Sequence, residues 1–126
     1  KVVQRHRRWV SDEGVRDIAD FLGLSPDAVD SVATFYNLVF REPVGRHVIL
    51  LCDSISCWLV GHDEIRERLN ERLGIGFGET TGDGRFTLLP TVCLGACDGA
   101  PAMMVDGRLH TGLSADGLED ILAAYE

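Results

Sequence analysis

The chain has 126 residues, of which 45% are hydrophobic, and this suits one domain, or one domain with a small appendage. Its formal net charge of −8 argues against nucleic-acid binding, because phosphate contacts need a basic surface. No apolar run approaches the roughly 18–20 residues that span a bilayer, and no signal peptide is visible. Membrane-spanning and nucleic-acid-binding classes are therefore disfavoured.

The first part of the chain is predicted to be helical. Apolar residues recur at helical spacing over Val2–Val10, which predicts a first helix. Ser11 and Ser25 are suited to N-cap a second and a third helix, and Gly23 is suited to end the second. We therefore expect a small three-helix N-terminal domain at residues 1–44.

From residue 46 the pattern changes to that of an α/β protein. Val48–Leu51 is a continuous apolar run, as expected of a buried strand. A helix is predicted at Asp63–Leu73, a Gly-rich loop at residues 75–85, and a second strand at Arg85–Val92. Pro90 within that strand indicates an edge or a bulge. The strand–helix–strand order implies a right-handed crossover between parallel strands.

A hairpin and a helix are expected to complete the second part of the chain. Residues 101–111 are predicted to form two short strands around Asp106-Gly107, a type I′ turn sequence. Ser114 is suited to begin a last helix. We therefore expect residues 45–126 to form a thioredoxin-like α/β domain with a four-stranded mixed sheet and flanking helices.

The chain's four cysteines fall into two pairs. Cys52 and Cys57 are separated by four residues, and Cys93 and Cys97 by three. Each pair follows a predicted strand, and the carboxyl ends of parallel strands meet at one edge of a sheet. The fold would thus bring four thiolates together. The absence of a signal peptide favours a reducing compartment, where clustered cysteines more often bind metal than form disulfides.

Four thiolates suit zinc or an iron–sulfur cluster. Structural zinc loops usually place about two residues between cysteines, although two to four occur. A [2Fe–2S] cluster needs two thiolates on each of two irons, which two longer loops can supply. Small residues near the cysteines, Gly95 and Ser54 among them, let backbone amides approach the sulfurs.

From these residues we predict that Cys52 and Cys57 bind one iron and that Cys93 and Cys97 bind the other. Zinc and two structural disulfides stay open as alternatives. A thioredoxin-type dithiol is disfavoured because the chain has no C-x-x-C sequence.

Other polar and aromatic residues have weaker signals. Trp58 is suited either to shield a cluster from water or to pack in a core. His47 is suited either to form a hydrogen bond near the site or to have a structural role. Asp53 and Asp98, if close to the cysteines, would lower a reduction potential; solvated loop acids are the equal alternative. The histidines lack metal-ligand spacing, and no phosphate-loop sequence is present, so no nucleotide site is assigned.

Several segments closely resemble the NuoE-type small [2Fe–2S] subunits of respiratory complex I, which have a thioredoxin-like ferredoxin fold. The resemblance runs along almost the whole chain. Its segments are Val32-Ala33-Thr34-Phe35-Tyr36, Pro43-Val44-Gly45-Arg46-His47, Cys52-Asp53-Ser54-Ile55-Ser56-Cys57, Gly78-Glu79-Thr80-Thr81, Asp83-Gly84-Arg85-Phe86-Thr87-Leu88 and Cys93-Leu94-Gly95-Ala96-Cys97-Asp98-Gly99-Ala100-Pro101.

This resemblance implies an electron-transfer subunit of NADH:quinone oxidoreductase that carries one [2Fe–2S] cluster on Cys52, Cys57, Cys93 and Cys97. It implies a NuoF-type partner that carries FMN, the NADH site and a further cluster, so this chain would not be catalytic alone. The expected location is cytoplasmic, peripheral to the inner membrane (the matrix side in mitochondria). The helical domain, with Phe35-Tyr36, is the expected docking part.

Two rival functions stay open from the sequence. The first is the diaphorase subunit of a soluble NAD-dependent hydrogenase or formate dehydrogenase, which the cysteine sequences do not separate from complex I. The second is a zinc-stabilised interaction module, which has no electron-transfer role.

Overall fold

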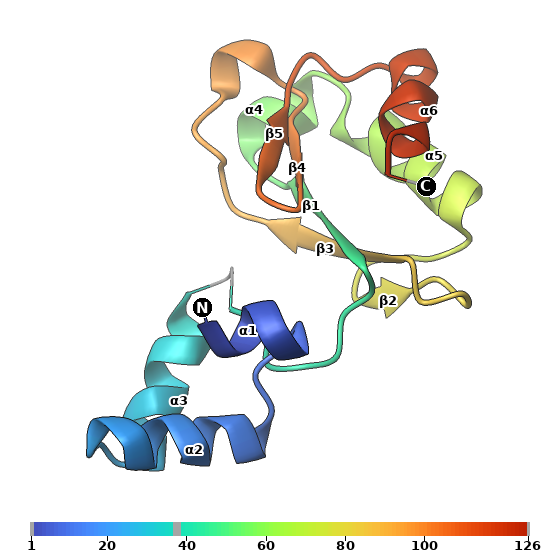
Figure 1. Cartoon of the computed structure of the whole chain (residues 1–126). Helices are drawn as coiled ribbons and strands as arrows, with labels where there is room; N and C mark the ends of the chain where they lie inside the picture. Colours follow the sequence, from blue (N-terminus) through green and yellow to red (C-terminus); the bar gives the residue numbers. More distant parts are fainter. Residues whose placement is uncertain (1, 37–38, 126) are drawn as a thin grey trace. The chain divides into compact units, whose positions relative to one another are not determined.

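A computed structural model describes residues 2–36 and 39–125, so Asn37 and Leu38 of the aromatic segment lie outside the described residues. The chain divides into two compact units, residues 1–44 and residues 45–126 (Figure 1). Every helix in the described part of the chain falls short of the length and hydrophobicity needed to cross a bilayer.

The unit of residues 1–44 is helical, and its helices begin where the sequence predicts. Its elements are α1 (Val2–Arg7), α2 (Asp12–Leu22) and α3 (Pro26–Phe35). The Ser11 hydroxyl accepts the N–H of Gly14 at 3.1 Å, and the Ser25 hydroxyl accepts that of Ala28 at 3.2 Å. Gly23 ends α2 with a φ of 68°, a left-handed conformation that glycine adopts without strain.

The first helix is shorter than predicted. It ends at Arg7 rather than Val10, because Arg8 has a φ of 70° and leaves the helical conformation. Val10 instead donates its N–H to the carbonyl of Phe40 at 2.7 Å, and its own carbonyl accepts a hydrogen bond from Arg41. The segment after α1 is thus tied to the end of the unit.

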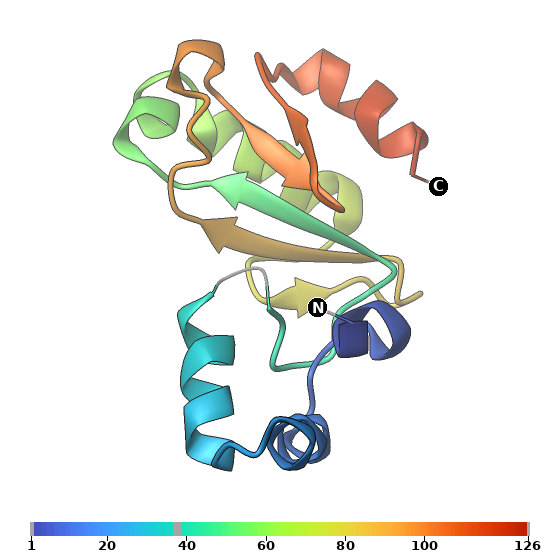
Figure 2. The same ribbon diagram turned by 60° about the vertical axis from the view of Figure 1, so that its left-hand side comes forward.

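The unit of residues 45–126 is built on a five-stranded mixed sheet, and the predicted α/β class is confirmed. The strand order is β2-β3-β1-β4-β5. Its strands are β1 (His47–Cys52), β2 (Glu79–Thr80), β3 (Phe86–Thr91), β4 (Met103–Val105) and β5 (Arg108–His110). Strands β1 and β3 are parallel, as predicted, and Figure 2 shows their arrowheads side by side and pointing the same way.

The sheet has one strand more than the predicted four. Strand β2 lies in the segment that was predicted to be a loop, and its two residues are too few to show a period of two in the sequence. It pairs only with Thr87 and Leu88 of β3.

Pro90 lies near the end of β3, beyond the end of β2. The carbonyls of Phe86 and Leu88 face β2, so the side of Pro90 that lacks an N–H also faces that way. Strand β3 is an inner strand rather than an edge strand, but the proline lies where the outer side of β3 is not paired with β2.

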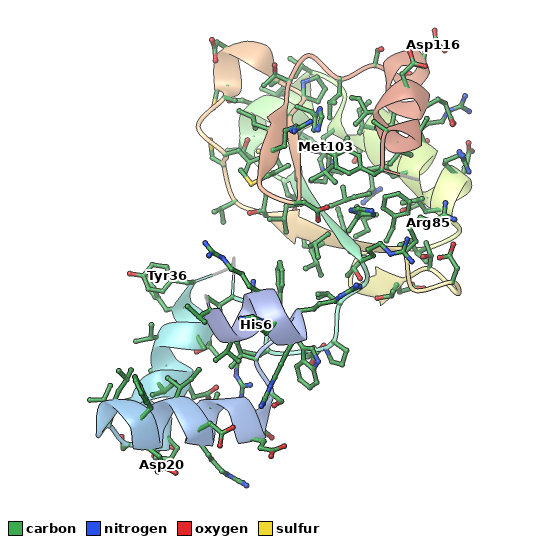
Figure 3. The ribbon with its side chains drawn as sticks, in the orientation of Figure 1. His6, Asp20, Tyr36, Arg85, Met103 and Asp116 are labelled. Carbon is green, nitrogen blue, oxygen red and sulfur yellow. The ribbon has the colours of Figure 1, made fainter. Side chains whose placement is uncertain are left out.

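Helices α5 (His62–Leu73) and α6 (Ala115–Ala123) cover one face of the sheet. The strands contribute every second residue to that face, as pleating requires. Met103, labelled in Figure 3, is fully buried there. The main buried side chains of this core are Ile49, Leu51, Ile65, Leu69, Phe86, Leu88, Met103, Val105, Leu118 and Leu122.

Candidate functional site

The two cysteine pairs follow the ends of the two parallel strands. Cys52 is the last residue of β1, and Cys93 lies two residues beyond the end of β3. Cys57 is on the short helix α4 (Ile55–Leu59), which was not predicted from the sequence, and Cys97 begins the 3₁₀ helix η1 (Cys97–Gly99). All four cysteines are free thiols, so the two structural disulfides considered above are absent.

Cys52 and Cys57, here called the buried pair, are each 2% exposed. Side chains alternate along a strand, so Cys52 lies on the face of β1 opposite to Ile49 and Leu51. The buried pair packs with Ala102 in a small cluster separate from the main core. The surroundings of the two sulfurs are therefore apolar, and any charge on them depends on hydrogen bonds.

Hydrogen bonds converge on the sulfur of Cys52. Burial by itself would raise the pKa of the Cys52 thiol, but donors from the Ser54 hydroxyl, the Leu94 N–H and the Cys57 thiol lower it overall. The Ser54 Oγ lies 3.3 Å from the Cys52 Sγ. Burial and the hydrogen bond with Cys52 raise the pKa of Cys57, while the Ala102 N–H opposes this. The site thus stabilises the Cys52 thiolate relative to that of an isolated cysteine.

Cys93 and Cys97, here called the exposed pair, lie in the loop after β3, with their sulfurs 3.3 Å apart. The N–H of Gly95 donates to the Cys93 Sγ at 3.3 Å. The hydrogen bond with Cys93 raises the pKa of Cys97, although the Ser56 hydroxyl opposes it. The charge of Cys52 also raises this pKa, so the two pairs are within electrostatic range of one another.

The structure gathers the cysteines as two pairs. Within residues 2–36 and 39–125, no group of three or more His, Cys, Asp or Glu side chains is close enough to hold one metal ion. Two neighbouring thiolate pairs have the donor set of a binuclear cluster, with two thiolates for each of two irons. The N–H and hydroxyl donors described above are the groups that stabilise negative charge on such sulfurs.

The structure answers part of what the sequence left open for His47 and Trp58. His47 is at the start of β1, at the other end of the strand from Cys52, and its Nδ1 lies 2.5 Å from Asp106 Oδ2. This contact joins the hairpin turn to β1, so His47 has the structural role that was one of its two alternatives. Trp58 is 59% exposed and does not pack in a core.

His62 was given no role from the sequence, yet it lies near the site. Its side chain is 3% exposed, and its Nε2 is 3.6 Å from the Oδ1 of Asp53, the residue after Cys52. Its Nδ1 is 3.4 Å from Asp63 Oδ1, and its ring stacks on Phe77. A histidine just after Gly61, at the start of α5, gives no signal in the sequence, because its burial depends on the packing of α5.

Comparisons with known proteins identify relatives of this chain. The family model "Thioredoxin-like [2Fe-2S] ferredoxin" matches residues 1–126. The E-type subunit of the NADH-quinone oxidoreductase of Pseudomonas aeruginosa is 49% identical over 125 residues, which cover 99% of this chain and 75% of the relative. The protein of the same name from Escherichia coli K12 is 48% identical over 126 residues, covering 100% of this chain and 76% of the relative.

The chain is also similar in fold to a solved hydrogenase. It superposes on a chain of the NAD+-reducing [NiFe]-hydrogenase in its air-oxidized state with a TM-score of 0.83 and 23% sequence identity. The match covers 98% of this chain and 22% of the hydrogenase chain, so this chain spans about a fifth of that one. At this identity the likeness concerns the fold alone.

Proposed function

Because the chain belongs to the thioredoxin-like [2Fe–2S] ferredoxin family, we propose that it carries one [2Fe–2S] cluster as the electron-transfer subunit of an NADH-quinone oxidoreductase. The predicted resemblance to the small subunits of this enzyme, and the oxidoreductase class, are confirmed by the relatives. The observation that carries the proposal is the placement of two thiol pairs after the parallel strands β1 and β3.

In this proposal Cys52 and Cys57 hold one iron, and Cys93 and Cys97 hold the other. The separation into two pairs, each with its sulfurs in mutual contact, supports this assignment. The backbone donors Leu94 and Gly95 support it too, since each points at a sulfur of the site.

When bound, a [2Fe–2S] cluster accepts and releases one electron at a time. The residues of this chain hold it, keep it partly out of water and set its charge balance. The apolar packing of the buried pair disfavours added negative charge, and the hydrogen-bond donors offset that effect. Asp53 and Asp98 lie beside ligands, and their charges would lower the reduction potential.

The hydride chemistry of NADH belongs, in this proposal, to a NuoF-type partner subunit that carries FMN and the NADH site, with the cluster of this chain near that FMN. The helical unit is the proposed docking part, because it exposes large apolar side chains: Phe21 is 89%, Phe35 80% and Tyr36 58% exposed. Figure 3 labels Tyr36 at the end of α3. The complex would place the chain on the cytoplasmic side of the inner membrane, peripheral to it.

A second candidate is the diaphorase subunit of a soluble NAD-linked dehydrogenase. The cysteine sequences do not separate it from the first candidate, and a chain of the NAD+-reducing hydrogenase shares the fold. The identities of 48–49% with NADH-quinone oxidoreductase subunits favour the first candidate over this one. Co-purification decides between them, since the chain is found either with membrane subunits that reduce quinone or with a soluble dehydrogenase.

The cluster is tested on the full chain after anaerobic reconstitution with iron and sulfide. The expected product is red-brown and holds two irons and two acid-labile sulfides per chain. A Cys57→Ser variant should lose most of the bound iron and sulfide. Ser31→Ala, at an exposed position of α3, is the control and should bind as much as the wild type. A chain that stays colourless with iron and sulfide but binds stoichiometric zinc when zinc is added overturns the proposal in favour of the zinc module.

A further inference from the structure

The two cysteine pairs differ sharply in their access to solvent. The buried pair is 2% exposed at each cysteine, and it is enclosed by Ala102 with Leu94, Ala96 and Ala100 packed around it. The exposed pair is open to solvent at both cysteines. Thiol reagents reach exposed thiols far faster than buried ones, so the two halves of one proposed site differ in chemical reactivity.

The exposed pair is also close enough to react with itself. Its sulfurs are 3.3 Å apart, compared with about 2.05 Å in a disulfide. Gly95 lies between the two cysteines with a φ of 77°, and no atom outside Gly95 and its two chain neighbours lies within 4 Å of the position that its Cβ would take. The loop therefore has open space, and a residue of wide conformational freedom, at the point where a small closing movement is needed.

We propose that, in the chain without its cluster, Cys93 and Cys97 form a reversible disulfide that blocks cluster loading. The oxidant is a low-molecular-weight disulfide. The thiolate of one cysteine attacks a sulfur of this disulfide, which makes a mixed disulfide and releases one small thiolate. The second cysteine then attacks the protein sulfur of the mixed disulfide and releases the other small thiolate.

The reaction is balanced in atoms and electrons. Two S–H bonds of the protein and one S–S bond of the oxidant are broken, and one S–S bond of the protein forms. The two protons pass to the two released thiolates, so the oxidant is reduced to two thiols and the cysteines are oxidised. Two of the four proposed iron ligands are thereby removed, and a dithiol reductant restores them.

This inference rests on the proposed cluster site, but its first test does not require the cluster. The full chain without cluster is incubated with oxidised glutathione, then unfolded in the presence of an alkylating reagent and cut with trypsin. Cleavage at arginines leaves the buried pair on residues 47–66 and the exposed pair on residues 86–108. The expected result is a disulfide within residues 86–108, lighter by two hydrogens, while both cysteines of residues 47–66 are alkylated after unfolding.

Single substitutions in the exposed pair are the controls. In Cys93→Ser the internal disulfide is lost, and a stable glutathione adduct accumulates on Cys97. In Cys97→Ser the adduct accumulates on Cys93. A disulfide within residues 47–66, a link between the two peptides, or four free thiols in the wild-type chain overturns the inference.

The second test measures loading by iron content and visible absorbance. The oxidised chain should take up no cluster until dithiothreitol is added, and the reduced chain should load at once. If the reduced chain fails to load, the proposed function fails. If the reduced chain loads and the chain with the closed disulfide loads equally well, the proposed function stands and the inference fails.

Discussion

The backbone N–H of Leu94 donates a hydrogen bond to the sulfur of Cys52. The loop after β3 therefore reaches the end of β1, although 42 positions separate these residues in the chain. This contact joins the exposed and the buried halves of the proposed site, and it can be changed without touching a cysteine.

Replacing Leu94 with proline removes this donor, because proline has no N–H. A sulfur that loses a hydrogen bond stabilises added negative charge less well, so we expect a more negative reduction potential for the loaded chain. A redox titration followed by visible absorbance measures it. Leu94→Ala keeps the N–H and should retain the wild-type potential; equal potentials for the two variants would contradict the prediction.

Gly95→Ala tests the turn between the exposed cysteines. The φ of 77° at this residue costs an L-residue about 1–2 kcal/mol, so we expect strain in the loop and slower cluster loading. The rate of colour development during reconstitution checks this. Gly82→Ala is the matched control, since no positive φ and no close atom is found at Gly82; the prediction fails if both variants load equally fast.

Arg41 should be a main support of the helical unit. Its side chain is 20% exposed, and its guanidinium nitrogens lie 2.7 Å from a carboxylate oxygen of both Asp12 and Asp30. These carboxylates raise the pKa of Arg41, so it stays charged. Arg41→Ala should lower the free energy of unfolding by about 1.5–3 kcal/mol, the range for hydrogen bonds to charged groups. Denaturant unfolding measures it.

Arg7→Ala is the matched control for this experiment. Arg7 and Asp17 form an exposed pair at 3.8 Å, and such pairs contribute about 0–1 kcal/mol. A loss of stability in Arg7→Ala as large as that in Arg41→Ala would show that the partly buried position of Arg41 between two carboxylates has no special effect.

His110 should make stability depend on pH. Burial, with a smaller effect of Arg108, lowers the pKa of His110 from its ordinary value of 6.5. The unfolded chain therefore binds a proton at higher pH than the folded chain does. The contribution of His110 to the free energy of unfolding is complete above pH 6.5. It is lost as the pH falls through the pKa of His110 in the folded chain.

The measurement is thermal unfolding between pH 7.5 and pH 5. His110→Gln should flatten the fall in stability at acid pH, whereas His6→Gln, on the exposed surface of α1, controls for the loss of one histidine. If the two variants have the same pH profile as the wild type, the burial of His110 has no energetic consequence.

Phe35→Ser tests docking by the helical unit. Phe35 is 80% exposed, and burial of such an aromatic ring often dominates an interface. We expect the affinity for the proposed flavin subunit to fall by about tenfold or more, with the fold unchanged by circular dichroism. Leu109→Ser, at 44% exposure on the edge strand β5, is the control, and equal affinities for both variants would remove the helical unit from the proposed interface.

Much of the fold follows from local sequence signals. Ser11 and Ser25 cap their helices, and Asp106-Gly107 adopts the positive φ values, 51° and 85°, of a type I′ turn. These features depend on residues close together in the chain, so the sequence alone predicts them. Strand β2 and helix α4 were missed because two and five residues are too few for a periodic pattern.

The sequence by itself determined the spacing of the four cysteines, their positions after two apolar runs, and the family that the chain resembles. Only the tertiary structure decided that Cys52 and Cys57 are buried while Cys93 and Cys97 are exposed. It also decided that the Leu94 N–H points at Cys52. Burial and this contact depend on how β1, β3 and α4 pack together, and residue types and local spacing do not specify packing between distant segments.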